Sequence, residues 1–410
     1  MCQELDATAR RASEGPRVPR RRTGLGSARS SATDRQRNRK LAAELRKTHG
    51  SDTTAQNGEK ARTAYSSAMQ RVKLIDVARA AGVHPGTASR ALNAGTGGRV
   101  SAETTRRVVQ AAKKLGYVPN NFARGLRTAR SFVIGMIVPD VTNSLFPPMV
   151  RGAEQVLSQV GYTLVVTDTD NDAATERSQI ERLLARGTDG FLIATARWDD
   201  PLVESLADSE VPAVLVNRNT GTHRLPYVGC DERTGISMAV DHLVALGHRR
   251  IVHLGGPQDT STGRERASAF RHALRTHGLL IGPDQVRVCV SYSEQAGGEE
   301  TTRLLASGQD FTAIVAGNDL IALGALAVLA AVGLRCPGQV SVVGFNDLPL
   351  VDKLTPALTT VSLPLREMGA LAARMLLSQI EDSGREGPVA QSLLGVELAV
   401  RGSTGPVPAR

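Results

Sequence analysis

From Phe132 onward, short apolar segments alternate with longer segments whose apolar residues recur at helical spacing, and this alternation limits the possible folds most strongly. The longer segments predict helices, for example over Met149–Val160, Gln179–Ala185 and Gly235–Leu246. The short segments predict buried strands; these are Phe132–Val138, Thr163–Thr167, Gly190–Ala194, Ala213–Val216, Ile251–Leu254, Ala313–Ala316 and Val340–Gly344. Alternating strands and helices form parallel sheets with helices on both faces, and ligands bind beyond the carboxyl ends of such strands. The sequence therefore predicts an α/β body with a ligand site at the strand ends.

A segment ahead of this body predicts three short helices. Apolar residues at helical spacing place the first over Leu74–Ala81, and Gly82 then reverses the chain. A second helix runs over Pro85–Asn93, because proline is favourable at a first helical position. The third helix begins after Ser101, whose hydroxyl can cap the free N–H groups, and continues to Leu115. Two helices around a tight glycine turn make a helix-turn-helix, so an all-α unit precedes the α/β body.

Positive charge is concentrated in this helical segment. Residues 69–130 contain 12 Lys and Arg against 2 Asp and Glu, a net charge of +10, whereas residues 131–410 carry −8. A basic segment of this size can neutralise several phosphates, so double-stranded DNA is the predicted partner, although charge alone also fits a solvated face. On the second helix Gly86, Ser89 and Arg90 point outward, and Arg90 is the best placed to contact a base or a phosphate.

The first 68 residues carry a further +8 and contain few large apolar residues, which predicts a disordered basic leader. Met69 stands directly before the first patterned segment. We therefore interpret residues 1–68 either as a start-site artefact or as a dispensable basic arm, and the sequence favours neither.

Missing patterns exclude other classes of protein. The longest nearly apolar run, Leu320–Leu334, has 15 residues, and about 20 are needed to cross a membrane, so no membrane span is expected. Scattered cysteines without a CxxC pair, together with the lack of a secretory signal, predict a reduced cytoplasmic protein. No GxGxxG or GxxxxGK[ST] motif follows a predicted strand, and GxSxG and HExxH are absent. We therefore expect neither a cofactor nor an enzyme activity.

Metal binding is not predicted. Asp168, Asp170 and Asp172 alternate like calcium-loop ligands, but Ala173 stands where the loop needs glycine and Gln179 where it needs glutamate. A solvated strand end is the favoured interpretation. Three histidines are interpreted as helix-end or core residues; these are His242, His248 and His253.

The helix-turn-helix segment resembles a known family. The matching runs are Leu74–Ala78, Ala81–Val83, Thr87–Asn93, Arg99–Ser101 and Leu115–Asn120. They look like the DNA-binding headpiece of the lactose-repressor/galactose-repressor (LacI/GalR) family of bacterial transcription factors. The resemblance implies a headpiece over residues 71–118, a hinge helix over residues 119–130, and a leucine wedge, Leu126, that unstacks a base step from the minor groove at the operator centre. An ordinary linker residue is the alternative for Leu126. The positions that match the family's DNA contacts are Pro85, Gly86, Thr87, Ser89, Arg90, Asn93, Tyr117, Asn120, Arg124 and Leu126.

The headpiece departs from the family pattern at its helix starts and its hinge. Lys73 and His84 stand where the family usually has a capping Ser or Thr, which predicts less firmly capped helices. The loop over residues 94–98 is longer than usual. Gly125 disfavours helix by about 1 kcal/mol relative to alanine, which is consistent with a hinge that folds only on DNA.

The body resembles the same family to about residue 400. Its markers are Ile134–Asp140, His242–Ile251, Asn318–Gly324 and Ser341–Asp347. The resemblance implies the fold of periplasmic sugar-binding proteins, with two α/β subdomains over residues 131–402 and an effector in the cleft between them. We expect the chain to cross between the subdomains near Cys230, near Thr360 and near Leu394, and to end in a tail over residues 403–410.

The matching positions make Arg266 the leading effector residue, because a guanidinium fork can bind two vicinal hydroxyls or a carboxylate. The other implied effector contacts are Phe146, Trp198, Asp199, Tyr292, Asn318, Asn346 and Leu363. Core packing is the alternative for each aromatic residue. Asn217 and Asn346 replace aspartates that are frequent in the family, so the cleft is less acidic and can suit an effector other than a simple neutral sugar.

The resemblance implies an allosteric transcriptional regulator, a repressor that binds a pseudo-palindromic operator as a homodimer. Its effector is expected to be a sugar or sugar derivative, which either releases the operator or promotes its binding. A solute-binding protein of a sugar transporter shares the body fold but predicts a signal peptide and no helix-turn-helix. An α/β enzyme that uses cleft carboxylates is a third hypothesis, which no motif supports.

Overall fold

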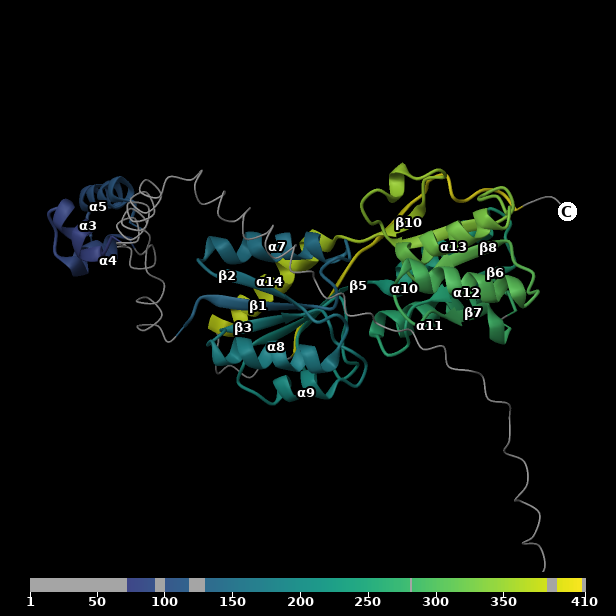
Figure 1. The fold of residues 1–410 in the computed structure, drawn as a ribbon, viewed down its shortest axis with the longest axis horizontal. Coiled ribbons are helices and arrows are strands. Elements are labelled where there is room, and N and C mark those ends of the chain that lie inside the picture. Colours follow the sequence, from purple (N-terminus) through teal and green to yellow (C-terminus); the bar gives the residue numbers. More distant parts are fainter. Residues whose placement is uncertain (1–71, 93–99, 118–129, 281, 382–388, 408–410) are drawn as a thin grey trace, which may run out of the picture. The chain divides into compact units, whose positions relative to one another are not determined.

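The computed structural model describes residues 72–92, 100–117, 130–280, 282–381 and 389–407. It divides into two compact units, Met1–Pro119 and Asn120–Arg410, which are described separately (Figure 1). Several predictions lie outside the described residues: the basic leader, the hinge helix over residues 119–130, and the DNA contacts Asn93, Asn120, Arg124 and Leu126.

The first unit contains the three expected headpiece helices. They are α3 (Leu74–Ala80), α4 (Pro85–Leu92) and α5 (Ala102–Leu115), each within a residue or two of its predicted bounds. One apolar cluster holds them together; its buried members are Val77, Ala78, Ala81, Ala88, Val108 and Ala112. This packing fixes α4 against α3, so the remaining face of α4 is turned to solvent.

The helix caps of the headpiece differ from expectation at one position. Ser101 Oγ accepts a hydrogen bond from the Thr104 N–H at 3.2 Å, as predicted. At α3, the Lys73 side chain makes no cap, but the Lys73 backbone N–H donates to Asp76 Oδ2 at 2.9 Å. At α4, which lacks the usual Ser or Thr, the His84 imidazole Nδ1 accepts the Gly86 N–H at 3.2 Å, so this helix start does have a side-chain cap. A neutral imidazole has a ring nitrogen that can replace the hydroxyl oxygen of a usual cap.

The amino-terminal subdomain of the second unit is built on a six-stranded parallel sheet. Its strands are β1 (Val133–Val138), β2 (Thr163–Asp168), β3 (Gly190–Ile193), β4 (Ala213–Val216), β5 (Tyr227–Cys230) and β11 (Gln391–Leu394), in the order β11-β5-β4-β3-β1-β2. Helices α7 (Phe146–Gln159) and α14 (Leu365–Glu381) cover one face, and α8 (Ala173–Ala185) and α9 (Pro201–Ala207) cover the other (Figure 1). Both faces are therefore buried, which explains the nearly continuous apolar strands.

The carboxyl-terminal subdomain repeats this architecture. Its strands are β6 (Ile251–Gly255), β7 (Val286–Val288), β8 (Ala313–Ala316), β9 (Ser341–Asn346), β10 (Thr359–Ser362) and β12 (Glu397–Ala399), in the order β12-β10-β9-β8-β6-β7, with only β12 antiparallel. Its helices are α10 (Glu232–Ala245), α11 (Ser261–Thr276), α12 (Glu294–Ala306) and α13 (Asp319–Ala331), with the 3₁₀ turns η2 (Pro283–Gln285) and η3 (Val351–Lys353). The α10–α11 and α12–α13 pairs each pack side by side.

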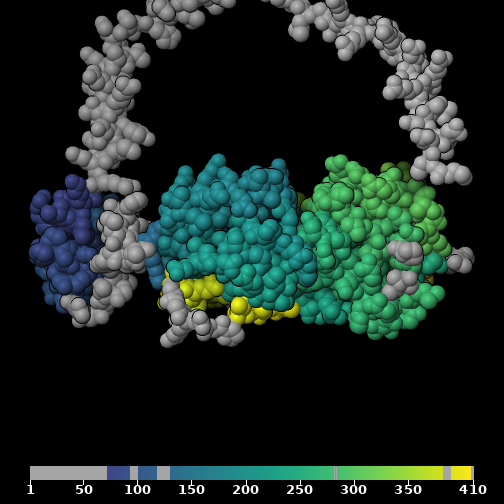
Figure 2. Space-filling view, turned by 90° about the horizontal axis from the view of Figure 1, so that it is seen from below, coloured from purple at the N-terminus to yellow at the C-terminus, as the bar shows by residue number. Residues whose placement is uncertain are grey.

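The chain passes between the two sheets at three places. It leaves β5 at Cys230 for α10, leaves β10 at Ser362 for α14, and leaves β11 at Leu394 for β12. Figure 2 shows the two subdomains as separate masses that meet along a boundary. Three crossing segments beside this boundary form the connection about which two such subdomains can move. In the described part of the chain, no helix is both long enough and apolar enough to cross a membrane.

Candidate functional site

The described headpiece exposes basic side chains on all three of its helices, and α4 turns one face to solvent. Gly86 and Arg90 are exposed, whereas Pro85, Thr87 and Ser89 are half-buried at the edge of that face. The Arg90 guanidinium donates to Thr87 Oγ1 at 3.4 Å. The exposed basic side chains of the described headpiece are Lys73, Arg79, Arg90, Arg106, Arg107, Lys113 and Lys114. Tyr117 packs against the edge of the headpiece core.

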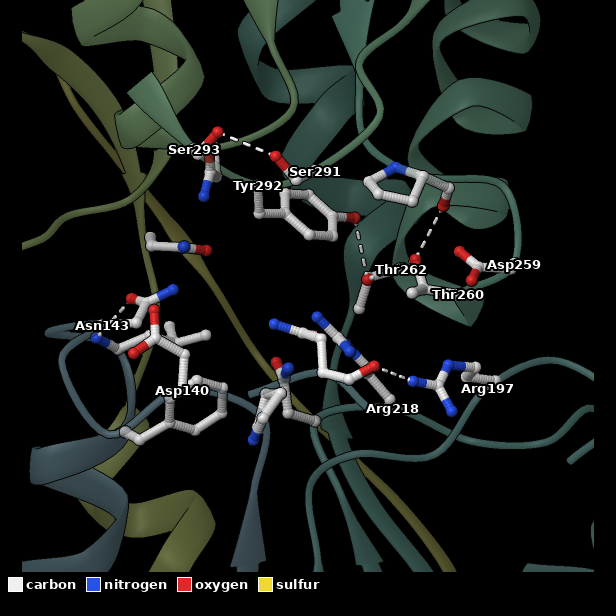
Figure 3. A pocket seen from close by; sticks show the side chains of 18 of the residues that line it. Asp140, Asn143, Arg197, Arg218, Asp259, Thr260, Thr262, Ser291, Tyr292 and Ser293 are labelled. Carbon is white, nitrogen blue, oxygen red and sulfur yellow. Dashed lines mark hydrogen bonds between the residues drawn. The ribbon is translucent and has the colours of Figure 1, made fainter. Parts of the chain in front are cut away.

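A cavity of about 480 Å³ lies between the two subdomains of the body (Figure 3). Its walls come from loops that follow β1, β2, β3 and β4 on one side and β6, β7, β8 and β9 on the other. The site therefore lies at the strand carboxyl ends, where parallel sheets bind ligands. The lining residues are Pro139, Asp140, Asn143, Leu145, Phe146, Asn171, Arg197, Asn217, Arg218, Pro257, Asp259, Thr260, Thr262, Arg266, Val290, Ser291, Tyr292, Ser293, Asn318 and Asn346.

Five of the sequence-predicted effector residues lie in this lining: Phe146, Arg266, Tyr292, Asn318 and Asn346. Asn318 Oδ1 accepts the Ile321 N–H at 2.9 Å and so caps α13, which leaves its NH₂ group for the cavity. The buried Asn346 Oδ1 has no hydrogen-bond partner in the described part of the chain. The Tyr292 and Thr262 hydroxyls, from the same subdomain, lie 2.9 Å apart (Figure 3). These groups can both donate to and accept from a hydroxylated ligand.

Arg266 enters the cavity with most of its charge already compensated. Only 3% of its side chain is exposed, and Glu232 accepts from its Nε at 2.5 Å and from its Nη2 at 3.1 Å. Its Nη1 donates to the Gly317 carbonyl, and the guanidinium stacks over Phe345, 3.9 Å from the ring centroid. Burial lowers the pKa of Arg266, but the Glu232 carboxylate outweighs it and raises that pKa above its ordinary value. Two N–H groups of the fork stay available to a ligand.

The other three sequence-predicted effector residues do not line the cavity. Trp198 lies at its flank, where the Arg264 guanidinium carbon stands 5.0 Å from the centroid of its ring and the Trp198 backbone N–H donates to the Asp259 carbonyl at 2.7 Å. The Asp199 side chain is exposed, and Leu363 is buried in the apolar core beside the second crossing. Trp198 and Asp199 instead line a second hollow, together with the first turns of α8 and α9.

Two arginines that line the cavity were not predicted from the sequence as site residues. Arg197 follows β3 and Arg218 follows β4, so both stand just beyond the carboxyl end of a strand that the sequence predicts correctly. That position was the available signal for both residues. The cavity is thus more basic than the sequence analysis indicated.

The histidines and aspartates considered as metal ligands have other partners. His248 contacts Thr312, Ser341 and the Gly405 carbonyl, and His253 Nδ1 lies 2.8 Å from the Val315 carbonyl. Asp172 caps α8 by accepting the Thr175 N–H at 2.7 Å. Over the described ranges, no group of three or more His, Cys, Asp or Glu side chains is arranged to hold a metal ion.

Comparison with known proteins accounts for both units. Residues 73–120 match the family model for bacterial regulatory proteins of the lacI family, and residues 240–404 match a periplasmic binding protein-like domain. The ribose operon repressor of Halalkalibacterium halodurans is 32% identical over 306 residues, which cover 75% of this chain and 89% of that protein. A solved complex of the transcriptional regulator CelR with cellobiose is 32% identical, with a TM-score of 0.62, over 81% of this chain and all of that one. The lac repressor dimer bound to operator and the anti-inducer ONPF is 28% identical, with a TM-score of 0.68, over 82% of this chain and all of that one. The chain is therefore a member of the lacI family of bacterial regulatory proteins.

Proposed function

We propose that this chain represses transcription as a homodimer on a pseudo-palindromic operator, in the cytoplasm, and that a sugar or sugar derivative bound in the cleft controls its affinity for DNA. The observation that carries this proposal is the combination, in one chain, of a basic helix-turn-helix unit with a cleft whose polar walls come from two separately folded subdomains. The similar lac repressor binds operator as a dimer, and the similar CelR binds cellobiose. We further propose that the cleft binds its ligand without catalysing a reaction on it.

The DNA contacts are proposed on α4 and around it. The face that enters the major groove is formed by Pro85, Gly86, Thr87, Ser89 and Arg90. Tyr117, which packs at the edge of the headpiece core, contacts the DNA backbone. The same proposal assigns DNA contacts to Asn93, Asn120, Arg124 and Leu126 from the sequence alone.

The effector is proposed to contact both subdomains at once. Phe146 comes from the amino-terminal subdomain, whereas Arg266, Tyr292, Asn318 and Asn346 come from the carboxyl-terminal one. A ligand held by both walls binds a closed cleft better than an open one, and it shifts the equilibrium by that difference in affinity. Trp198, Asp199 and Leu363 then act at the flank and the crossing, where they follow the motion of the subdomains.

The start of the body can transmit this motion toward the DNA-binding unit. The Ser131 and Phe132 N–H groups donate to the Asp189 carboxylate at 2.7 and 2.9 Å, and Arg130 donates to the Ile380 carbonyl at 2.6 Å. These bonds fix the first residues of the body to the amino-terminal subdomain. A rotation of that subdomain therefore displaces the point at which the hinge segment joins the body.

The test is a fluorescence-anisotropy titration of the purified protein on the promoter DNA beside its gene, at several salt concentrations, with and without candidate sugars. We expect specific binding to exceed nonspecific binding by at least about 10³-fold, as is typical of such regulators. Arg90→Ala should weaken specific binding, whereas Arg186→Ala, in the body, should not. Equal affinity for promoter and unrelated DNA under every condition would refute the proposal.

A further inference from the structure

Arg218 is a buried cation in the cleft whose guanidinium forms no ion pair with any of the described residues. It follows β4, its side chain is 9% exposed, and it lines the cavity beneath Thr262 and Tyr292 (Figure 3). Its Nε is buried without a hydrogen-bond partner, and among the described residues its guanidinium forms no ion pair. Its nearest aromatic contact is the Tyr292 ring, whose centroid lies 5.7 Å from the guanidinium carbon.

The other two arginines of the cavity are compensated within the protein. Arg266 is paired with Glu232, and Arg197 donates to the Asn171 carbonyl and lies 3.9 Å from the buried Glu176 carboxylate. Neither acid that lines the pocket, Asp140 or Asp259, forms an ion pair with Arg218. Asp140 Oδ1 accepts from the Thr142 N–H and hydroxyl, and Asp259 is exposed at the rim. The positive charge of Arg218 therefore stays unpaired when the cleft is empty.

An unpaired buried guanidinium is costly, because it keeps its proton at any physiological pH. Burial lowers the pKa of Arg218, and Tyr292 and Asp259 oppose this only partly. Buried charges in folded proteins are ordinarily paired or bound to a ligand. The cost of burying Arg218 is explained if a negatively charged ligand forms an ion pair with its guanidinium.

The surroundings of Arg218 also favour negative charge. The 16-residue helix α11 begins at Ser261, and its first turn brings Thr262 to the cavity beside the capping residue Thr260. A helix amino terminus attracts anions through its free N–H groups and its dipole. The Thr262 and Tyr292 hydroxyls lie on the same wall and bond to each other at 2.9 Å, so one of the two can turn its hydrogen toward a bound oxyanion. A fork, a helix terminus and a hydroxyl donor are the groups that proteins use to bind an oxyanion.

We propose that the effector is a hydroxylated, sugar-like molecule that carries an oxyanion, either a phosphate monoester or a carboxylate, and that Arg218 binds this oxyanion. The Asn318 and Asn346 amides and the two remaining N–H groups of Arg266 then bind its hydroxyls. This inference rests on the proposed effector-controlled function, because it assigns the chemistry of the same cleft.

The first test needs no knowledge of the effector. The melting temperature of the full-length protein is measured against increasing inorganic phosphate, for the wild type, Arg218→Met and the control Arg271→Met, which removes an exposed arginine from α11. Kosmotropic anions stabilise all folded proteins somewhat, so the difference between variants is the readout. We expect phosphate to raise the melting temperature of the wild type and of Arg271→Met more than that of Arg218→Met. Equal shifts in all three proteins would overturn the proposal.

Two further measurements separate a ligand role for Arg218 from a structural one. Without phosphate, the melting temperature of Arg218→Met should equal or exceed that of the wild type, because an unpaired buried charge has been removed. A fall in the melting temperature of this variant would assign Arg218 to the fold and overturn the proposal. Arg218→Lys should keep part of the phosphate response, since it retains the charge but loses the fork.

The second test distinguishes the two oxyanions with matched sugars: glucose, glucose 6-phosphate and glucuronate, then ribose and ribose 5-phosphate. Binding is followed by the fluorescence of Trp198, the only tryptophan in the chain, which flanks the cleft. We expect an anionic member to bind, and Arg218→Met to weaken it at least about tenfold, as for the loss of a charge-assisted hydrogen bond. Tighter binding of the sugar phosphates or of glucuronate then shows which of the two oxyanions the site prefers.

Failure of this inference is distinguishable from failure of the proposed function. If a neutral sugar changed operator affinity in the wild type and equally in Arg218→Met, the regulator would stand and the oxyanion would be refuted. If phosphate stabilised the wild type through Arg218 but no ligand changed operator affinity, the oxyanion site would stand and effector control would fail. If none of the five sugars bound, the phosphate comparison alone would decide for or against the site.

Discussion

At the residue scale, the cleft is defined by how its charges are compensated. Arg266 is an effector candidate from the sequence, but its pairing with Glu232, 34 positions away, is a property of the fold. Position along the chain predicts which loops meet at the strand ends. It does not predict which carboxylate comes within hydrogen-bond reach, because that depends on how α10 and α11 pack.

Glu232→Gln should therefore destabilise the protein strongly. It leaves Arg266 buried with an uncompensated charge, and breaking a buried pair from one side costs about 3 kcal/mol or more. Urea unfolding measures the difference. Glu299→Gln is the control, because Glu299 pairs with Arg303 at an exposed position on α12, where little change is expected. Equal stability of the two variants would show that the Glu232–Arg266 pair is not compensating a buried charge.

Asp319 should make stability depend on pH in an unusual direction. Burial raises its pKa to about 7, although Thr360 and the Leu348 N–H, which donate to it, lower that pKa and Asp347 raises it. The folded state thus keeps a proton that the unfolded state loses near the ordinary value of 3.8. The contribution of Asp319 to stability is full below that value and is lost as pH rises toward 7.

Asp319→Asn removes this loss, since the amide keeps an acceptor and carries no charge. The variant should gain stability relative to the wild type as pH rises from about 4 to 7, by up to about 1.4 kcal/mol per pH unit. Urea midpoints at pH 5 and pH 7.5 check this. A difference between variant and wild type that is the same at both values would contradict the raised pKa.

At the scale of elements, strands with a continuous apolar run were predictable from the sequence, and strands without such a run mostly were not. All seven strands read from the sequence exist; six of them are apolar and largely buried, whereas β2 lies at the sheet edge and is partly exposed. The five that were missed are short or partly polar: β5, β7, β10, β11 and β12. β11, with the sequence QSLL, is half-exposed at the sheet edge, and β10 is the polar run TTVS buried by its surroundings. Their pairing comes from tertiary contacts that local pattern does not carry.

The amino end of α4 has a cap that its sequence does not suggest. His84 lacks the usual capping hydroxyl, yet its Nδ1 accepts the Gly86 N–H. His84→Ala should destabilise the headpiece by about 1 kcal/mol and weaken operator binding, whereas His84→Ser should restore both, because serine is a preferred cap. Operator anisotropy and thermal unfolding measure the two effects. If serine behaved like alanine, the imidazole would be acting through something other than the cap.

The packing of α12 on α13 depends on one of two adjacent glycines. A Cβ at Gly297 would lie 2.4 Å from the Ile321 carbonyl oxygen, whereas a Cβ at Gly298 would meet nothing closer than the Val328 side chain at 3.5 Å. Gly297→Ala should destabilise the body by about 1–3 kcal/mol through overpacking. Gly298→Ala should stabilise it by up to about 1 kcal/mol through helix propensity. Urea unfolding of this pair checks the contact, and two shifts of the same sign would contradict it.

At the scale of the whole molecule, basic and acidic parts have separate tasks. Residues 1–68 carry +8, residues 69–130 carry +10 and the body carries −8, so the net positive charge lies entirely ahead of the body. The body instead acts through the relative position of its subdomains. Control of such a molecule depends on the few contacts that join the two walls of the cleft.

One such contact is a hydrogen bond from the Asn219 N–H, in the amino-terminal subdomain, to Ser261 Oγ at the start of α11, at 3.0 Å. Ser261→Ala removes the acceptor and weakens this arrangement of the cleft by about 1 kcal/mol. Since a ligand held by both walls favours that arrangement, half-saturation should need about fivefold more effector. Coupling between sites is reciprocal, so the effector concentration that changes operator affinity should rise by the same factor. Ser205→Ala is the control, because its hydroxyl bonds only within α9, to the Leu202 carbonyl. Titrations of effector binding and of the effector-dependent change in operator affinity, made on the same preparations, measure both factors. A shift in one without the other would mean that the two walls do not transmit effector binding to DNA.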